Sequence, residues 1–187
     1  MNTNKKVIFV LGGPGSGKGT LCSRIEKELE CEHYEHYLHL SVGELLRKEK
    51  DNELVKEYIK EGKIVPSFIT INLLKNYMLK SDNNKFLIDG FPRNEENKDV
   101  WEKQTDNFEL EYVLYLECDL KTMIDRIMNR NENRSDDNIE TFRKRIKVFD
   151  NVTMPVINYY EKKEKLVKID ATQSAENVFE IVKNILL

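Results

Sequence analysis

Residues 12–20, with the sequence GGPGSGKGT, carry the residue types that bind phosphate groups. Glycines let a backbone curl until successive N–H groups point at one anion, and a helix that starts there adds the positive end of its dipole. Lys18 would bring a mobile positive charge to the outer phosphates. An apolar strand is predicted just before this segment and a helix just after it, which favours a phosphate-binding loop over a chance glycine-rich turn.

A second candidate site lies at residues 86–93, with the sequence FLIDGFPR. Asp89 ends a predicted strand, and a carboxylate there could hold Mg²⁺ through one of the water molecules that this ion keeps. Arg93 could donate two parallel hydrogen bonds to phosphate oxygens. Taken alone, the segment could equally be a strand end followed by an ordinary turn. The phosphate loop earlier in the chain favours the site.

The elements that must position these groups follow an alternating pattern. Short apolar runs predict five strands, at residues 7–11, 37–40, 86–88, 112–116 and 166–169. Stretches with helical spacing lie between them, for example residues 21–29, 69–79, 123–128 and 178–186. Strands that alternate with helices predict an α/β fold of the doubly wound type, with a five-stranded parallel sheet flanked by helices.

Several helix boundaries are marked in the sequence. Ser41 precedes Glu44 at the spacing of a capping box, and Asp119 is a candidate N-cap. Pro155 lies inside an otherwise helical pattern and predicts a kink or break there, because proline cannot donate the backbone hydrogen bond.

Composition excludes several classes of protein. A chain of 187 residues favours one domain, and a net charge of −3 argues against a general nucleic-acid binder. No apolar run is long enough for a membrane span, and no signal peptide is recognised, so we expect a protein of the cytoplasm or the nucleus without a membrane partner. The three cysteines (Cys22, Cys31 and Cys118) are expected to be reduced thiols.

Five motifs stand in one order along the chain: residues 12–20, 41–47, 62–66, 89–93 and 134–138. In this set and order the chain resembles the adenylate kinase family of nucleoside-monophosphate kinases, nearly from end to end. The usual phosphate loop has Ser or Thr directly after its lysine, whereas this chain has Gly19 and then Thr20. That ending is also typical of the family. The resemblance implies transfer of the γ-phosphoryl group of ATP, with Mg²⁺, to a nucleoside monophosphate.

The resemblance also implies a single domain, residues 1–187, with two mobile inserts. Residues 41–65 would close over the acceptor nucleotide, and residues 130–138 would form a short lid over ATP. Between the two lid arginines this chain has Asn-Glu-Asn, which is shorter than is usual in relatives and has no glycine. Relatives of this short-lid type are usually monomers, so we expect a monomer.

The family's site residues carry over by position. ATP would contact Gly15, Ser16, Gly17, Lys18, Gly19, Thr20, Arg130 and Gln173. The acceptor would contact Arg47, Lys63, Ile64, Val65, Gly90, Phe91, Arg93, Asn97, Arg134 and Arg145. Catalysis would rest on Lys18, Asp89, Arg93, Arg134 and Arg145, and Mg²⁺ on Asp89 (through water) and Thr20. Without the resemblance, the arginines at 130, 134 and 145 would be interpreted as a solvated helix face.

The acceptor base is indicated by Asn94 and Asn97. Adenylate kinases typically have glutamine at the position of Asn97, whereas UMP/CMP kinases have the Asn-x-x-Asn pattern seen here. An amide offers both a donor and an acceptor, so it could pair with cytosine or uracil. Val42 lacks the hydroxyl of the threonine usual in adenylate kinases. CMP or UMP, and with them dCMP, are therefore the expected acceptors.

Other interpretations remain open. Asn94 could be a helix N-cap, and Asn97 a polar surface residue in the first turn of that helix. The protein could be an adenylate kinase that uses AMP. It could also be a non-catalytic ATP-binding module, although such a protein would have lost the metal carboxylate, Asp89, or the lid arginines.

Overall fold

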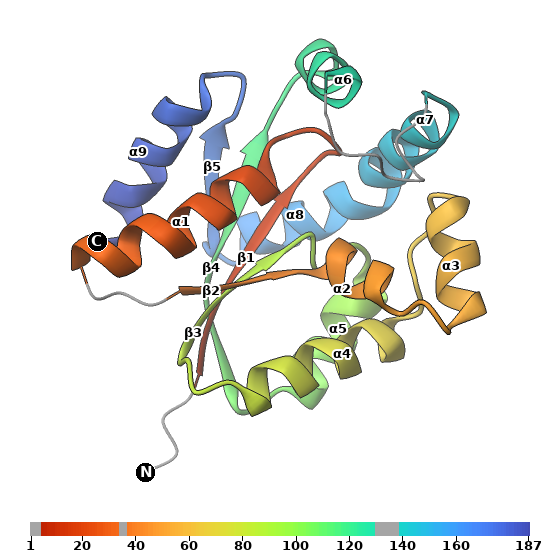
Figure 1. Cartoon of the computed structure of the whole chain (residues 1–187), viewed down its shortest axis with the longest axis horizontal. Helices are drawn as coiled ribbons and strands as arrows, with labels where there is room; N and C mark the ends of the chain where they lie inside the picture. Colours follow the sequence, from red (N-terminus) through yellow and green to blue (C-terminus); the bar gives the residue numbers. More distant parts are fainter. Residues whose placement is uncertain (1–4, 34–36, 130–138) are drawn as a thin grey trace.

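A computed structural model describes residues 5–33, 37–129 and 139–187. Five strands form one sheet: β1 (Lys5–Gly12), β2 (Tyr37–Ser41), β3 (Lys85–Asp89), β4 (Phe108–Glu117) and β5 (Leu166–Asp170). Their order is β2-β3-β1-β4-β5, and every neighbouring pair is parallel (Figure 1). The predicted five-stranded parallel sheet is confirmed.

Helices cover both faces of this sheet. They are α1 (Lys18–His33), α2 (Val42–Lys48), α3 (Glu53–Lys60), α4 (Ser67–Lys80), α5 (Glu95–Gln104), α6 (Leu120–Met128), α7 (Ile139–Val148), the π-helical turn η1 (Phe149–Thr153), α8 (Met154–Lys162) and α9 (Ala175–Leu186). Successive side chains of a strand point to opposite faces. Val7 and Phe9 pack with residues of α4, α5 and α8, whereas Ile8 and Val10 pack with residues of α1 and α9. Helices α1 and α9 lie on one side of the sheet, and α4, α5 and α8 on the other (Figure 1). The fold is therefore doubly wound. None of these helices is both long and apolar enough to cross a membrane, within the ranges that the structure describes.

The strand β4 begins earlier than its apolar run predicts. It starts at Phe108, beside Lys5 of β1, and includes the polar residues Glu109 and Glu111. The partner strand also begins with charged residues, and Lys6 Nζ lies 2.7 Å from Glu111 Oε1. Opposite charges on neighbouring strands let a polar segment pair where hydropathy alone predicts none.

The predicted helix starts are confirmed. Ser41 Oγ accepts a hydrogen bond from the Glu44 N–H at 3.4 Å, and Asp119 Oδ1 accepts from the Thr122 N–H at 2.9 Å. Asn94 Oδ1 accepts from the Asn97 N–H at 2.7 Å, so Asn94 is the N-cap of α5. The irregularity predicted at Pro155 is also present, because the helical run widens into η1 just before α8.

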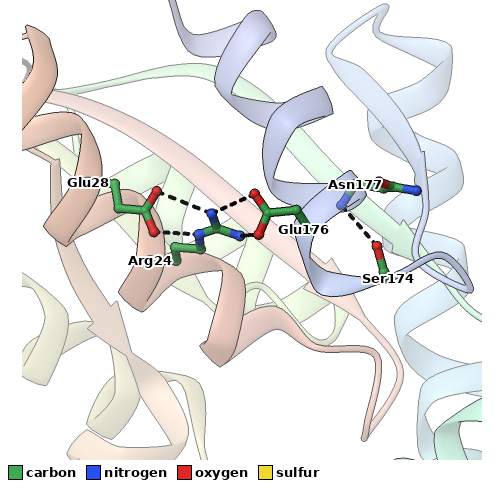
Figure 2. Close-up of polar contacts among 5 residues, drawn as sticks. All are labelled: Arg24, Glu28, Ser174, Glu176 and Asn177. Carbon is green, nitrogen blue, oxygen red and sulfur yellow. Dashed lines mark hydrogen bonds and ion pairs between the residues drawn. The ribbon is translucent and has the colours of Figure 1, made fainter.

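Helices α1 and α9 are joined by Arg24, as Figure 2 shows. Its Nη1 and Nη2 donate to the two carboxylate oxygens of Glu176 at 2.6 and 2.9 Å, and its Nε donates to Glu28. The guanidinium also lies 3.9 Å from the centre of the Phe179 ring. Since α1 starts at the phosphate loop, the C-terminal helix helps to hold the helix that carries that loop.

Candidate active site

A cavity of about 280 Å³ opens where the carboxyl ends of β1 and β3 meet the phosphate loop. This edge of a parallel sheet is where α/β proteins bind ligands. Segments far apart in the sequence line the cavity, from the loop, α2, the turn before α4, the end of β3 and the α7–η1 run. The predicted site residues among its lining are Gly15, Gly17, Lys18, Gly19, Thr20, Arg47, Lys63, Ile64, Asp89, Gly90, Arg93 and Arg145.

The loop has the backbone of a phosphate cradle. Gly15 and Gly17 have φ angles of 85° and 94°, which side-chain-bearing residues rarely adopt. A Cβ atom on Gly15 would lie 2.6 Å from the carbonyl oxygen of Met123, so the loop also packs closely on α6. Larger residues at this position are excluded on both grounds.

Lys18 folds over the loop. Its Nζ donates to the carbonyl oxygens of Gly12 and Gly13 at 2.9 and 2.8 Å. Burial lowers the pKa of Lys18 to about 8; the Asp89 carboxylate opposes this, and Arg93 adds to it. A phosphate group that entered the cavity would offer this ammonium the anionic partner that it needs.

Asp89 lies against the loop, at the end of β3. Its Oδ2 is 3.6 Å from the position of a Cβ atom on Gly19, and 3.5 Å from His39 Nε2. Burial by itself would raise the pKa of Asp89, but the His39 ring and the positive charges of Lys18 and Arg93 outweigh it and lower that pKa. A charged carboxylate that lines the same cavity as Thr20 suits Mg²⁺, which binds few carboxylates and retains water.

Positive side chains reach the cavity from three further elements. Arg47 comes from α2, Arg93 from the segment after β3, and Arg145 from α7. The Nε of Arg93 donates to the Gly90 carbonyl at 2.7 Å, and Gly90 has a φ angle of 78°. With Lys18 and Lys63, five basic residues line one cavity, whose acidic lining residues are Glu44 and Asp89. The site therefore favours anions although the net charge of the chain is −3.

Other predicted residues lie apart from the lining of this cavity. The side chain of Phe91 is fully buried, and its ring lies 5.6 Å from that of Phe9 and 5.4 Å from that of Trp101. Val65 also belongs to the core on that face, and Ser16 is buried within the loop. Arg130 and Arg134 lie outside the described residues.

Asn97 is a buried residue, so its interpretation as a surface residue is wrong. It is 2% exposed, its Oδ1 accepts from the Arg93 N–H at 3.1 Å, and its Nδ2 donates to Ser67 Oγ at 2.8 Å. A backbone N–H can only donate, which fixes which end of the amide faces Arg93. The second N–H of Nδ2 and the second lone pair of Oδ1 could still pair with a base. Contact between Asn97 and a base stays a prediction.

Arg126 has a role that the sequence analysis missed. Its guanidinium donates to the carbonyl oxygens of Ala171 and Gln173 at 2.8 and 3.0 Å, and it approaches the Ser16 carbonyl at 3.4 Å. It thereby joins the segment after β5, where Gln173 lies, to the phosphate loop. The sequence could have indicated this role through spacing alone: Arg126 lies three residues after Met123, and so on the buried side of α6.

The sequence of this chain matches a known protein family. The family model described as "Adenylate kinase" matches residues 10–165. The chain belongs to the adenylate kinase family. The resemblance drawn from the five motifs is thus confirmed, and the phosphate loop and the end of β3 both lie inside the matched range.

Several proteins that are similar to this chain are named as UMP-CMP kinases. "UMP-CMP kinase 3" of Arabidopsis thaliana is 53% identical over 184 residues, which cover 96% of this chain and 88% of that protein. "UMP-CMP kinase" of Danio rerio is 47% identical over 195 residues, covering 97% and 96%. "UMP-CMP kinase" of Mus musculus is 48% identical over 192 residues, covering 95% of each. The similarity extends over nearly the whole of both chains.

Proposed function

We propose that this protein transfers the γ-phosphoryl group of MgATP to a pyrimidine nucleoside monophosphate, CMP or UMP and with them dCMP, giving ADP and the nucleoside diphosphate. One observation carries the proposal: Lys18, Arg47, Arg93 and Arg145 converge on a single cavity that ends at a phosphate loop. The similarity to UMP-CMP kinases, at about half of all aligned positions, supports the pyrimidine acceptor.

On the donor side, the N–H groups of residues 15–20 and the Lys18 ammonium would hold the phosphates of ATP. Arg130 and the segment around Gln173 would contact the rest of the nucleotide. Asp89, through water, and Thr20 would hold Mg²⁺, which neutralises charge on the phosphates when it is bound.

On the acceptor side, Arg47 and Arg93 would hold the phosphate of the monophosphate. Lys63, Ile64 and Val65 would line its nucleoside, largely through their backbone, with Gly90 and Phe91 beside it and Asn97 at the pyrimidine edge. These assignments make residues 41–65 an acceptor-binding insert of one domain that spans residues 1–187.

The reaction leaves little covalent chemistry to the protein. Its tasks are to align donor and acceptor and to neutralise the charge on the moving phosphoryl group. Arg145 would serve that second task together with Arg134, and residues 130–138 would close as a lid. Arginines that arrive in this way can raise rates by about 10³–10⁵. Closure also excludes water that would otherwise hydrolyse ATP.

Two alternatives are weaker. Kinases that use AMP typically have glutamine at the position of Asn97, and Val42 lacks the hydroxyl of the threonine that is usual in them. A non-catalytic ATP-binding module has no reason to retain both Asp89 and the arginines. We expect the enzyme to act as a monomer in the cytoplasm or the nucleus, on small nucleotides and without nucleic-acid or membrane partners.

The test is coupled release of ADP from MgATP with CMP, UMP, dCMP, AMP and GMP, each supplied separately. Rapid turnover with CMP and UMP and little with AMP is the expected result. A preference for AMP would overturn the pyrimidine assignment while leaving phosphoryl transfer in place. Absence of turnover with all five would favour the binding module.

A further inference from the structure

The peptide groups on both sides of Arg93 are held by side chains from two other places in the fold. Asn97 Oδ1 accepts from the Arg93 N–H at 3.1 Å. Thr153 Oγ1 donates to the Arg93 carbonyl oxygen at 2.8 Å, across 60 residues of sequence. Arg93 lies between β3 and α5, outside the regular backbone hydrogen bonds of either element. Side chains therefore take the place of backbone partners here. The direction of the Arg93 backbone therefore depends on these two side chains.

Thr153 occupies an unusual position. It is the last residue of η1, is 5% exposed, and lines the same cavity as Arg93 and Arg145. Single π-helical turns inside α-helices are rare and occur frequently at functional sites. Since α7, η1 and α8 follow one another without a break, the hydrogen bond from Thr153 also ties the helical run that carries Arg145 to the segment that carries Arg93.

We propose that Thr153 is a positioning residue of the acceptor-phosphate site, and this rests on the proposed function of Arg93. A guanidinium binds a phosphate through two parallel hydrogen bonds, which demand a fixed direction as well as a fixed place. Holding the Arg93 carbonyl fixes the peptide from which that side chain extends. Misplacement of such a group by about 1 Å can reduce a rate by two orders of magnitude.

Thr105 offers a matched control, because a buried threonine could simply stabilise the fold. It too is 5% exposed, and its Oγ1 donates to the Trp101 carbonyl oxygen at 2.5 Å. It lies at the end of α5 and is not among the residues that line the cavity. Both threonines are thus buried, and the hydroxyl of each donates to a backbone carbonyl oxygen. The carbonyl that Thr153 meets belongs to a site residue, Arg93, whereas the carbonyl that Thr105 meets does not.

The experiment compares Thr153→Val, Thr153→Ser and Thr105→Val in the full chain. Valine keeps the shape of threonine and removes the hydroxyl, whereas serine keeps the hydroxyl. For Thr153→Val we expect KM for CMP and UMP to rise about three- to tenfold, the range of a lost hydrogen bond, while KM for MgATP stays within about twofold. Thr153→Ser should restore the wild-type KM, and Thr105→Val should lower Tm without changing either KM.

An unchanged acceptor KM in Thr153→Val would overturn the proposal, as would an equal kinetic change in Thr105→Val. Thr153→Ala gives a second hydroxyl-free variant if valine prevents folding. If the wild-type enzyme prefers AMP, the proposed pyrimidine specificity fails, and Thr153 is then judged by the KM for AMP. If no monophosphate is turned over, calorimetric binding of CMP to wild type and variant decides: equal affinities would end the proposal, and weaker binding by the variant would support it.

Discussion

The candidate site gathers like charges that would repel one another without a ligand. Burial lowers the pKa of Lys18; Arg93 and Arg145 add to this effect, and Asp89 is the largest influence that opposes it. Binding of a polyanion would relieve this repulsion. At the scale of single residues, the site is therefore arranged for a ligand that carries several negative charges.

Lys18→Ala should reduce kcat/KM by at least about a hundredfold, the effect of removing one donor that stabilises developing charge. The fold should remain, because the hydrogen bonds of Lys18 run to Gly12, Gly13 and Ser16 in the loop that it covers. Coupled ADP release measures the activity, and a thermal melt checks folding. Lys168→Ala is the control, since that lysine pairs with Glu161 on the surface. Near-wild-type turnover by Lys18→Ala would contradict the role assigned to the phosphate loop.

Asn97→Ala should raise KM for CMP and UMP several-fold, because the truncation removes both the partner of the Arg93 N–H and any contact with the base. Ser67→Ala separates these effects, since it removes only the acceptor of the Asn97 amide and leaves the amide itself. We expect a smaller change in KM for Ser67→Ala. Steady-state kinetics with each monophosphate are the measurement, and an unchanged KM in Asn97→Ala would remove the reason to assign this residue to the base.

Single-residue roles could be predicted from the sequence where the chemistry is local. Lys18, Asp89 and Arg93 stand in contiguous motifs, and all three line the cavity. Arg126 and Thr153 could not be found in that way, because their partners lie 45 and 60 residues away. Nothing in the neighbouring sequence of either residue indicates the carbonyl that it will meet.

At the scale of elements, local signals predict where helices start and tertiary pairing decides where strands start. The N-caps at Ser41, Asn94 and Asp119 each need only a residue three positions away. The start of β4 depends instead on the Lys-rich beginning of β1, a separate segment. The apolar runs therefore predicted the position of all five strands, but they predicted a β4 of residues 112–116 where the strand spans Phe108–Glu117.

Ser174→Ala should destabilise the protein by about 1 kcal/mol, the usual effect of losing an N-cap. Ser174 Oγ accepts from the Asn177 N–H at 3.2 Å at the start of α9, and the residue is exposed (Figure 2). Denaturation in urea measures the change. Ser174→Asp should retain most of the stability because aspartate is also a good cap. Equal losses in both variants would show that the hydroxyl does not cap this helix.

At the scale of the whole molecule, the first and last helices support each other through Arg24. The hydrogen bond from Arg24 lowers the pKa of Glu176, and Glu176 and Glu28 in turn raise the pKa of Arg24. A carboxyl whose pKa is lower in the folded than in the unfolded state stabilises the fold above its unfolded pKa, near 4.3 for glutamate. That contribution is lost as the pH falls through the lower, folded value.

Glu176→Gln should therefore lower Tm at pH 7, and its difference from wild type should shrink as the pH falls from about 6 to about 3. The charge-neutral amide has no such titration. Thermal melts of both proteins across that range, at low and high salt, are the measurement. Glu180→Gln, a change one turn further along α9, is the control. A difference in Tm that stays constant with pH would mean that packing, and not the charge of Glu176, joins the two helices.

The contacts of Arg24 and Arg126 have a consequence for how the protein becomes active during synthesis. The phosphate loop leaves the ribosome before most of the segments that surround it, because β1 lies between β3 and β4 and Arg126 joins the loop to the carbonyl groups of Ala171 and Gln173. Helix α9 (Ala175–Leu186), which holds α1, emerges after all of these segments. We therefore expect a nascent chain to carry the phosphate loop in an incomplete setting until residues 171–186 have emerged, and to acquire full affinity for nucleotides only then.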